Sequence, residues 1–519
     1  MSLELLSTYF IFVIHNQASF IEHKHTLMSN NIDIKDIYFG KSTAEKEGDS
    51  LHNYFISTRP YLNAKDHEKR RLLYVGNRGS GKSALFAQLS YELNIKQKNI
   101  VTKIMPFDFT YRAFKDMEHD FSDVRVAYVN AWYYTLLYHV FECVLKYFEE
   151  HKNINKNKEN VKVINDFLVS SGFKKNDTKV KILIAIMKRL SSLKVKIKTK
   201  NIKLESDKPE YDEILDMFAG EDVKMPLKAL SYITSTHPIH IFIDELDTGW
   251  DNAQESHNFI NGLLRAAEKL NNMEGIYVYI SLRKDMYNNL YIDDAEKMRG
   301  DIELLRWDKD NLKNLIGRRL IIQNPSIEGF LENISYDQAL SLVFEDGVFE
   351  YIVKNTLHRP REIIELCNLA AQKYTDIYYT RFLYGKKIDL RIIDEVMETF
   401  SFDRFNDVCR EYDKEYPGIR QLLEYFECCK VEMSHNEFLD QLEKSLVAFS
   451  YKCSKHQWVN EYMVNPIHLL EKLYDIGFIK ISKGYGYYAS YEKSQVQYHN
   501  VTSIKINNVF RSALQCHEE

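Results

Sequence analysis

The chain has 519 residues, 45% of them hydrophobic, which is enough apolar side chains for two to four domains with buried cores. Its formal net charge of −5 at pH 7 argues against an overall basic surface of the kind that holds nucleic acid non-specifically. Its seven cysteines contain no C-x-x-C pair, so they indicate neither a zinc ribbon nor a disulfide framework, and we expect a reducing, cytoplasmic setting.

The N-terminal segment, residues 1–50, contains the apolar run Tyr9–Ile14. This run is too short to cross a bilayer, and it lacks the basic flank and the cleavage site of a secretory signal. We therefore expect a short buried strand or helix here, and no membrane partner. Met28 opens a second plausible start, so whether residues 1–27 belong to the native protein is a separate question for N-terminal mass spectrometry.

A phosphate-binding pattern follows the apolar run Leu72–Val75 and precedes a predicted helix. Glycines at these spacings let consecutive backbone N–H groups turn toward an anion, and the helix that starts near Lys82 directs its positive dipole end at the phosphates. Lys82 would reach the β- and γ-phosphates, and the Ser83 hydroxyl would bind Mg²⁺. The strand before and the helix after favour a nucleotide site over a surface turn. The predicted nucleotide-binding residues are Gly76, Asn77, Arg78, Gly79, Ser80, Gly81, Lys82 and Ser83.

Short continuous apolar runs within residues 51–325 predict an α/β core with a parallel sheet and helices on both faces, because strands covered on both sides show no alternation. The spacing between the phosphate loop and the fourth run exceeds what a crossover needs, so we expect an insertion at about residues 146–228. The predicted strands are Leu72–Val75, Ile100–Met105, Val126–Val129, Ile239–Ile243 and Ile276–Ser281.

Within the insertion, residues Leu193–Lys200 alternate strictly and would place four lysines on one face of a strand. A solvated edge strand, protected from aggregation by its lysines, is the favoured interpretation. A contact with a phosphate backbone or an acidic partner is the alternative.

Two adjacent carboxylates, Asp244 and Glu245, end the predicted strand Ile239–Ile243. Ligands of parallel sheets bind at the carboxyl ends of the strands. Asp244 would hold Mg²⁺, commonly through water, and Glu245 would polarise the water that attacks the γ-phosphoryl group of ATP. An acidic loop without a ligand is the alternative, and the phosphate loop upstream disfavours it.

Ser281 and Arg283 end the next predicted strand and place a hydroxyl and a guanidinium where the γ-phosphate should lie. Arg361 follows Pro360, which suits the first turn of a helix, and could point at the phosphates. Each arginine alone is more often a surface salt-bridge residue. After two strong motifs, we predict Ser281 as a sensor and four catalytic residues: Lys82, Glu245, Arg283 and Arg361.

Residues 326–400 show a helical pattern and predict a lid over the ATPase core, and residues 401–519 predict a third domain. Ser434 with Glu437 has the spacing of a capping box, and a helix over Pro466–Ile476 should stop at Gly477. Three helices followed by a β-hairpin resemble a winged helix. The elements are helices at Gly418–Cys428, Ser434–Leu446 and Pro466–Ile476 and strands at Phe478–Ile481 and Tyr485–Tyr491.

These motifs resemble those of the broad group of AAA+-like and STAND-type P-loop ATPases. Asn130-Ala131-Trp132 and Asp244-Glu245-Leu246-Asp247 look like the N-A-W and D-[DE]-L-D motifs of KAP and related bacterial ATPases. Ser281-Leu282-Arg283 is similar to a STAND sensor-1 region, and Arg359-Pro360-Arg361 resembles the sensor-2 segment of origin-recognition-type ATPases. The chain departs from KAP proteins in having no transmembrane insertion and from STAND proteins in having no repeat array. No guanine-reading [NT]KxD motif occurs, which favours ATP.

The resemblance implies an ATP-driven switch that oligomerises with itself through the ATPase domain and controls a protein effector. Many such bacterial proteins belong to anti-phage defence systems, and we take this as the expected biology. A neighbouring subunit's arginine can complete such a site, and Arg299 is the candidate for that finger.

Two other functions are open. An ATP-dependent DNA-binding protein would read duplex through the winged helix, but the helix Pro466–Ile476 has two acidic residues against one lysine. Lys480, Lys483 and Tyr485 on the wing are its encouraging residues. A small-molecule kinase is less favoured, because the adjacent Asp-Glu pair suits water as the acceptor.

Overall fold

The computed structural model describes residues 37–105, 124–151, 157–170, 221–248, 250, 253–290, 295–324, 334–378, 386–453, 457–493 and 496–518. The chain forms two compact units by its internal contacts. The first, here called the sheet unit, comprises residues 57–78 and 82–305, and the second, the helical unit, comprises residues 1–56, 79–81 and 306–519. The runs Tyr9–Ile14 and Leu193–Lys200 lie outside the described residues.

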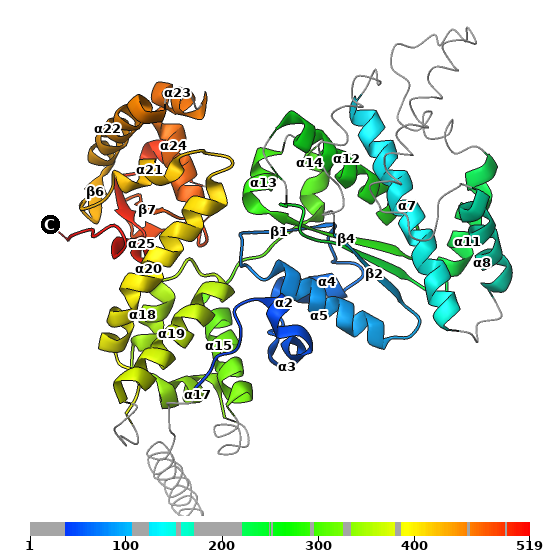
Figure 1. Ribbon diagram of the computed structural model, residues 1–519, viewed down its shortest axis with the longest axis horizontal. Helices are drawn as coiled ribbons and strands as arrows, with labels where there is room; N and C mark the ends of the chain where they lie inside the picture. Colours follow the sequence, from blue (N-terminus) through cyan, green and yellow to red (C-terminus); the bar gives the residue numbers. More distant parts are fainter. Residues whose placement is uncertain are drawn as a thin grey trace, which may run out of the picture. The chain divides into compact units, whose positions relative to one another are not determined.

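A five-stranded sheet forms the centre of the sheet unit (Figure 1). Its order is β2-β3-β4-β1-β5, and every neighbouring pair is parallel. The mixed α/β class and the parallel sheet are therefore confirmed, as are four of the five predicted strands. The strands are β1 (Leu73–Gly76), β2 (Ile100–Ile104), β3 (Ile239–Ile243), β4 (Ile276–Arg283) and β5 (Ile302–Leu304).

One face of this sheet is covered by aliphatic side chains and the other by aromatic ones. On one face, aliphatic side chains of β1, β3 and β4 join a core with helices α7 (Val124–Glu150) and α12 (Gln254–Asn271). On the other face, Tyr74, Phe242 and Tyr279 pack around Phe86 of helix α5 (Lys82–Ile95). Figure 1 shows α5 and α7 on opposite sides of the sheet. The apolar runs read as unbroken because successive residues are buried on alternate faces.

The prediction of a strand at Val126–Val129 is wrong, because these residues lie in the 27-residue helix α7. They face α12, where a Cβ added to Gly262 would lie 2.6 Å from Cβ of Tyr128. Trp132 packs edge-on against Phe259 and donates its indole N–H to the carbonyl oxygen of Phe259 at 3.1 Å. The N-A-W residues are thus core residues of a helix pair and do not follow a strand.

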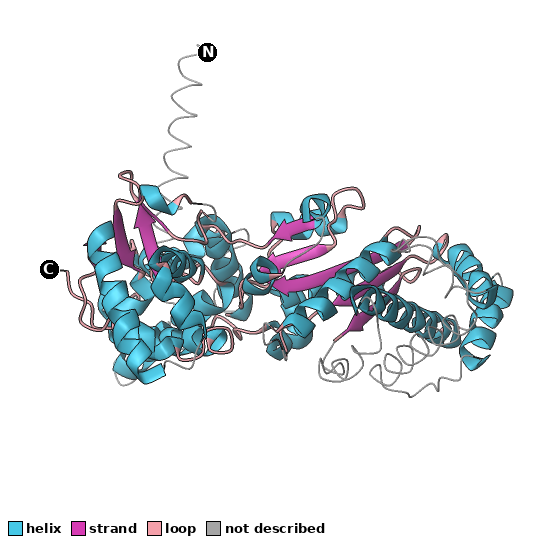
Figure 2. Ribbon diagram, turned by 90° about the horizontal axis from the view of Figure 1, so that it is seen from above, coloured by secondary structure: helices cyan, strands magenta, loops and turns pink. Residues whose placement is uncertain are grey.

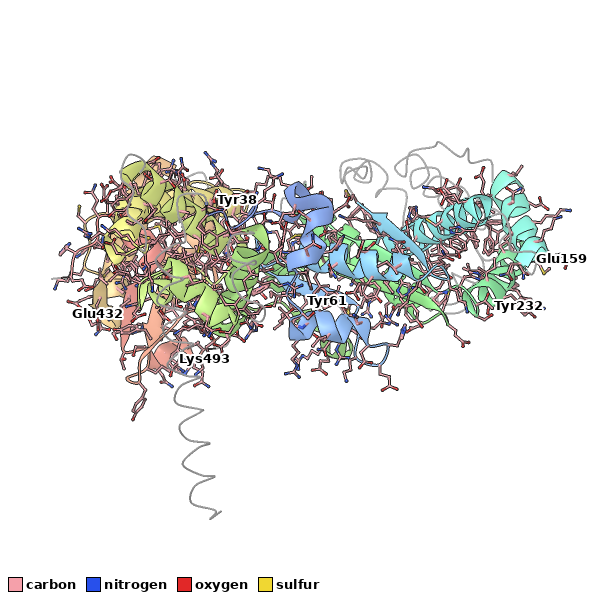
Figure 3. All side chains as sticks on the ribbon, turned by 90° about the horizontal axis from the view of Figure 1, so that it is seen from below. Tyr38, Tyr61, Glu159, Tyr232, Glu432 and Lys493 are labelled. Carbon is pink, nitrogen blue, oxygen red and sulfur yellow. The ribbon has the colours of Figure 1, made fainter. Side chains whose placement is uncertain are left out.

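The remaining helices of the sheet unit are short or flank the region of the expected insertion. Tyr61 of α4, labelled in Figure 3, donates a hydrogen bond to Glu92 of α5. Residues 171–220 lie between α8 and α11 and outside the described part of the chain. These helices are α4 (Arg59–Lys65), α8 (Lys158–Ser170), α11 (Glu221–Thr234), α13 (Lys284–Asn289), α14 (Ala295–Met298) and the 3₁₀ turn η5 (Arg299–Asp301).

The buried hydrophobic residues of the helical unit form a core cluster that runs from Ile37 to Leu514. Arg319 of α15 (Lys309–Gln323) fastens the segment before the sheet unit to this core, since both carboxylate oxygens of Glu47 lie 2.6 and 3.0 Å from its guanidinium. The other helices up to residue 424 are α2 (Ala44–Glu47), η2 (Gly48–Ser50), α3 (Leu51–Tyr54), α17 (Tyr336–Val343), α18 (Val348–Lys354), α19 (Pro360–Tyr378), α20 (Leu390–Tyr412) and α21 (Ile419–Glu424).

The last hundred or so residues of this unit combine helices with a four-stranded antiparallel sheet of order β6-β9-β7-β8, drawn in magenta in Figure 2. The capping box is present, because Ser434 Oγ accepts from Glu437 N at 3.3 Å while Glu437 accepts from Ser434 N. Helix α24 ends at Asp475, and Gly477 follows its C-cap with a φ of +84°, which favours glycine. The elements are β6 (Glu432–Ser434), α22 (His435–Cys453), α23 (Gln457–Val464), α24 (Pro466–Asp475), β7 (Ile479–Ser482), β8 (Tyr487–Tyr488), η6 (Tyr498–Asn500), β9 (Ser503–Ile506) and α25 (Asn508–Arg511).

This arrangement contains the predicted helix and hairpin but differs in its sheet. The hairpin β7–β8 is shorter than expected, and its turn passes through Gly484 and Gly486, both with positive φ. Strands β6 and β9 were not predicted. At the edge, Glu432 of β6, labelled in Figure 3, lies 2.7 Å from Lys505 of β9.

Candidate nucleotide site

The phosphate-loop sequence lies between the end of β1 at Gly76 and the start of α5 at Lys82. Gly79 and Gly81 have φ of +75° and +90°, a region that residues with a Cβ rarely adopt. The Lys82 ammonium group donates to the carbonyl oxygens of Gly76 at 2.9 Å and Asn77 at 3.0 Å. The loop is therefore folded back over its own lysine in the strand-to-helix setting that the sequence predicted.

The tip of the loop, Gly79–Gly81, belongs by its contacts to the helical unit. Trp307 donates its indole N–H to the carbonyl oxygen of Ser80 at 2.8 Å. A Cβ on Gly79 would lie 3.3 Å from Cβ of Arg361, and a Cβ on Gly81 would lie 3.8 Å from the Trp307 ring. A side chain at Gly79 would therefore press on Arg361, whereas Gly81 has room for a Cβ and favours glycine because of its positive φ.

Asp244 is placed by three neighbouring strands. Its N–H donates to Ile104 of β2 at 3.2 Å, and its Oδ1 accepts from Ser281 of β4 and from the backbone N–H of Glu245 at 3.0 Å. The side chain is almost fully buried, with Lys103 Nζ 3.8 Å from Oδ2. Among the described residues, Oδ2 has no hydrogen-bond partner.

An unbonded carboxylate oxygen in a buried position is costly, because the desolvated charge gains nothing in return. Oδ2 is thus available as an acceptor toward a donor or a cation that the protein does not supply. The oxygen ligands that Mg²⁺ prefers are a carboxylate, a hydroxyl and water, so Asp244 fits such a role. Ser83, at the start of α5, is the second predicted ligand.

Glu245 adopts a left-handed backbone with φ of +64°, which is uncommon for a residue that has a Cβ. Its carbonyl accepts from Thr248 N at 3.3 Å, so the chain turns directly after Asp244. Strain of this kind persists where the surroundings impose it, and it is concentrated at functional sites.

β4 lies between β3 and β1 and brings its own end to the same edge. Ser281 is level with Tyr74 in β1, and Arg283 is level with Gly76, where the phosphate loop begins. The predicted sensor Ser281 therefore meets the predicted magnesium ligand Asp244 directly. The Arg283 guanidinium faces Asp285 at 2.6 Å and Asp247 at 3.7 Å, so its described partners are carboxylates.

The arginines of the His358–Glu362 segment have different surroundings. Arg359 is 7% exposed, with Glu411 and Glu362 carboxylates 3.3 and 3.6 Å from its guanidinium. Arg361, in the first turn of α19, lies beside Gly79, and the Nε of each arginine is buried with no hydrogen-bond partner among the described residues. Of the two, Arg361 is the one that lies next to the phosphate loop.

Some residues near the site were missed and others remain apart from it. Trp307 and Lys103 contact the loop tip and Asp244, and neither stands in a sequence pattern that predicts this. Arg299, the finger candidate, lies exposed in η5. Within the described part of the chain, no group of three or more His, Cys, Asp or Glu side chains could hold a metal, and no helix is long and apolar enough to cross a membrane.

The fold and the loop first define a class, that of parallel α/β proteins with a phosphate-loop sequence between a strand and the following helix. A family model, the FunZ-associated C-terminal helical domain, matches residues 310–409, which hold α15 to α20. The chain is also similar to the putative transposon gamma-delta 80.3 kDa protein of Escherichia coli strain K12, with 23% identity over 471 residues. That alignment covers 88% of this chain but 63% of the relative, so the chain spans less than two thirds of that protein.

Three solved structures give distant matches, each over 90% of this chain. The Orc1 protein of Aeropyrum pernix in complex with DNA matches over 91% of its length with 11% identity and a TM-score of 0.33. The Orc2 protein of the same organism, in ADPNP-ADP complexes, matches over 92% with 10% identity and a TM-score of 0.34. Cdc6p of Pyrobaculum aerophilum matches over 98% with 12% identity and a TM-score of 0.28. At such TM-scores, residue roles must come from this chain's own geometry.

Proposed function

We propose that this chain binds and hydrolyses Mg-ATP at the sheet edge where β1, β3 and β4 end. The observation that supports this most is Asp244 Oδ2, a buried carboxylate oxygen without a hydrogen-bond partner, at the same edge as a glycine loop and its lysine. A buried charge that is stabilised by the fold alone would have its oxygens paired. A divalent cation would supply the partner that Oδ2 lacks, since Lys103 Nζ at 3.8 Å is too far away for a hydrogen bond.

In this proposal the backbone N–H groups of the loop and Lys82 bind the phosphates, while Ser83 and Asp244 hold Mg²⁺. The cation neutralises charge on the β- and γ-phosphates when it is bound. Glu245 orients a water and takes its proton as the water oxygen attacks the γ-phosphorus, and the bond to the bridging oxygen of ADP breaks. Ser281 holds the Asp244 carboxylate in place through Oδ1.

Arg361 is a further proposed phosphate-binding residue, because it lies beside Gly79 of the loop. It lies over Gly79 with a buried Nε that lacks a protein partner, so a phosphate oxygen would satisfy it. Three extensions of this proposal rest on the sequence resemblance. They are control of an effector, self-association through the ATPase core with Arg299 as a finger, and a role in anti-phage defence.

The first experiment replaces the phosphate-loop lysine. We expect Lys82→Ala to weaken Mg-ATP binding at least about 100-fold, because a desolvated ammonium–phosphate contact is lost. Lys96→Ala, an exposed lysine just beyond the other end of α5, should bind like the unaltered chain. Calorimetry measures binding, and phosphate release measures turnover. Equal affinity in Lys82→Ala and the unaltered chain would overturn the proposal.

A second candidate is binding of duplex DNA through the C-terminal sheet, favoured by Tyr485, which is 89% exposed at the β7–β8 turn beside Lys483. Lys480 does not support it, because burial lowers the pKa of this lysine to about 8 and Asn508 lies 3.4 Å from its ammonium group. Retention of the full chain on duplex that falls steeply with salt, and that Tyr485→Ala abolishes, would establish this candidate.

A further inference from the structure

We propose that Trp307 is a positioning residue of the phosphate loop, whose indole N–H orients the Ser80–Gly81 peptide so that the Gly81 N–H faces the phosphates. This rests on the proposed function, because it concerns how the same loop binds a nucleotide. Trp307 touches the loop and not the reacting atoms.

The hydrogen bond fixes the peptide plane. Trp307 Nε1 donates to the Ser80 carbonyl oxygen at 2.8 Å, and no cis peptide occurs in the described chain. In a trans peptide the carbonyl and the following N–H point in opposite directions within one plane. A carbonyl that is held toward the indole therefore turns the Gly81 N–H away from it, which is the direction that an anion-binding nest requires.

The position of Gly81 allows the ring to approach. A Cβ there would lie 3.8 Å from Trp307 Cζ2 and 3.9 Å from Nε1, which is ordinary van der Waals contact, so the indole edge that carries the donor lies directly beside this residue, whose φ is +90°. Ser80 is 5% exposed and its Oγ has no hydrogen-bond partner among the described residues. The loop tip thus has little water to replace the indole, and the carbonyl would be left unpaired without it.

Trp307 is itself held in place from its C-terminal side and from His358, which lies just before α19. The next residue, Asp308, caps α15 by accepting from Asn311 N at 2.7 Å. A Trp307 backbone group is hydrogen-bonded to His358, whose ring packs against Tyr491 with centroids 4.5 Å apart. The donor therefore has little freedom, as a positioning residue requires.

The test compares Trp307→Phe with Trp458→Phe. Trp458 is a matched control, since its indole N–H also donates to a backbone carbonyl, that of Pro417 at 3.3 Å, elsewhere in the helical unit. We expect Trp307→Phe to raise KM for Mg-ATP and Kd for Mg-ADP each about 10-fold with kcat within about twofold, because a contact made equally in ground and transition states affects KM alone. Trp458→Phe should change none of these.

Fluorescence gives a second readout. Mg-ADP should change the tryptophan emission of the unaltered chain and of Trp458→Phe, but not of Trp307→Phe. If Trp307→Phe does not fold, NMR of the ¹⁵N-labelled indole groups of the chain replaces it. Mg-ADP should shift one indole signal, and that signal belongs to Trp307 if it persists when Trp132, Trp250 and Trp458 are replaced one at a time.

The outcomes separate two failures. If the unaltered chain does not bind Mg-ATP, the proposed function fails. If it binds, Lys82→Ala does not, and Trp307→Phe matches the unaltered chain in KM and Kd, then Trp307 only packs against the loop and the present inference is wrong. The inference is also wrong if the indole signal that Mg-ADP shifts belongs to another tryptophan.

Discussion

Asp244 in the sheet unit and Arg359 in the helical unit are both charged and both nearly excluded from water, with 2% and 7% of their surface exposed. Their surroundings differ. The Arg359 guanidinium has carboxylates of Glu411 and Glu362 at 3.3 and 3.6 Å, whereas Asp244 has one hydrogen-bonded oxygen and one that receives no hydrogen bond from the described residues.

This difference separates two reasons for burying a charge. Burial costs several kcal/mol for each ion, and opposite charges in contact offset that cost within the fold. Arg359 is such a case, so we assign it to stability. Asp244 Oδ2 receives no hydrogen bond from the described residues, and the Lys103 ammonium group that pairs with it at 3.8 Å belongs to a largely exposed side chain, so the protein offsets its burial less completely. We therefore assign it to ligand binding, and each prediction below tests one side of that comparison.

The largest effect is expected where the paired charges are broken. Arg359→Met leaves Glu362 and Glu411 buried without their cation, and removal of one partner from a buried ion pair costs about 3–5 kcal/mol of stability. Arg361→Met, two residues further on, should cost no more than about 1 kcal/mol, because its Nε makes no hydrogen bond with the described residues that the change would break. Urea unfolding measures both.

A loss below about 1 kcal/mol for Arg359→Met would show that the Arg359 cluster is not a stabilising network. The pair of variants also tests the division of roles between the two arginines. If Arg361→Met keeps the same stability and the same affinity for Mg-ATP, its place beside Gly79 has no functional consequence.

The next effect concerns the unpaired oxygen. Asp244→Asn keeps the size of the side chain and removes its charge, so we expect turnover of Mg-ATP to fall about 100-fold or more, since a metal ligand contributes several kcal/mol to charge stabilisation. Stability should be unchanged or higher, because a neutral amide is cheaper to bury than a carboxylate.

The control for this variant is Asp389→Asn in the helical unit, where the aspartate caps α20 by accepting from Ile392 N at 3.1 Å. Asparagine caps helices about as well as aspartate, so both turnover and stability should stay close to those of the unaltered chain. Full turnover in Asp244→Asn would contradict the proposed magnesium role, and a large loss of stability would place Asp244 with Arg359 as a structural charge.

Much of the sheet could be predicted because its strands are short apolar runs, each followed directly by polar or charged residues of the candidate site. The run Ile239–Ile243 ends directly at Asp244, and the run from Ile276 ends at Ser281 and Arg283. The side-by-side placement of Asp244 and Ser281 follows from the strand order, in which β4 lies next to β3. A parallel sheet brings such ends to one edge whichever crossover connects them.

The errors have physical causes as well. Val126–Val129 was taken for a strand because a short apolar run lacks a period, and α7 is buried on nearly all sides there by α12 and the sheet. Strands β6 and β9 pair residues that are far apart in the chain, and three or four residues are too few to distinguish a strand from a loop.

Long-range contacts were likewise invisible in the sequence. Trp307 reaches Ser80 across 227 positions, and no local pattern marks a tryptophan that will donate to a distant carbonyl. The difference between Arg359 and Arg361 depends on Glu411, about fifty residues later, which a motif reading cannot include. Pairing of buried charges is a property of the folded chain.

The smallest expected effect is the pH dependence of stability that arises from protonation of His358, a buried residue of the helical unit. Burial lowers the pKa of His358 to about 4, against an opposing effect of Glu492, and its ring packs on Tyr491. The unfolded chain binds a proton near pH 6.5 and the folded one only near pH 4. Stability from this group is therefore complete above pH 6.5 and is lost as the pH falls toward 4, with about 2 kcal/mol lost at pH 5.

His358→Asn should remove that loss, since asparagine does not titrate and tolerates the φ of +53° found here. The measurement is the difference in unfolding free energy between pH 7.5 and pH 5, with the exposed His499→Asn as the control. A difference as large in His358→Asn as in the control would show that His358 is charged in the folded chain, and the helical unit would then hold a buried cation that its neighbours must pair as they pair Arg359.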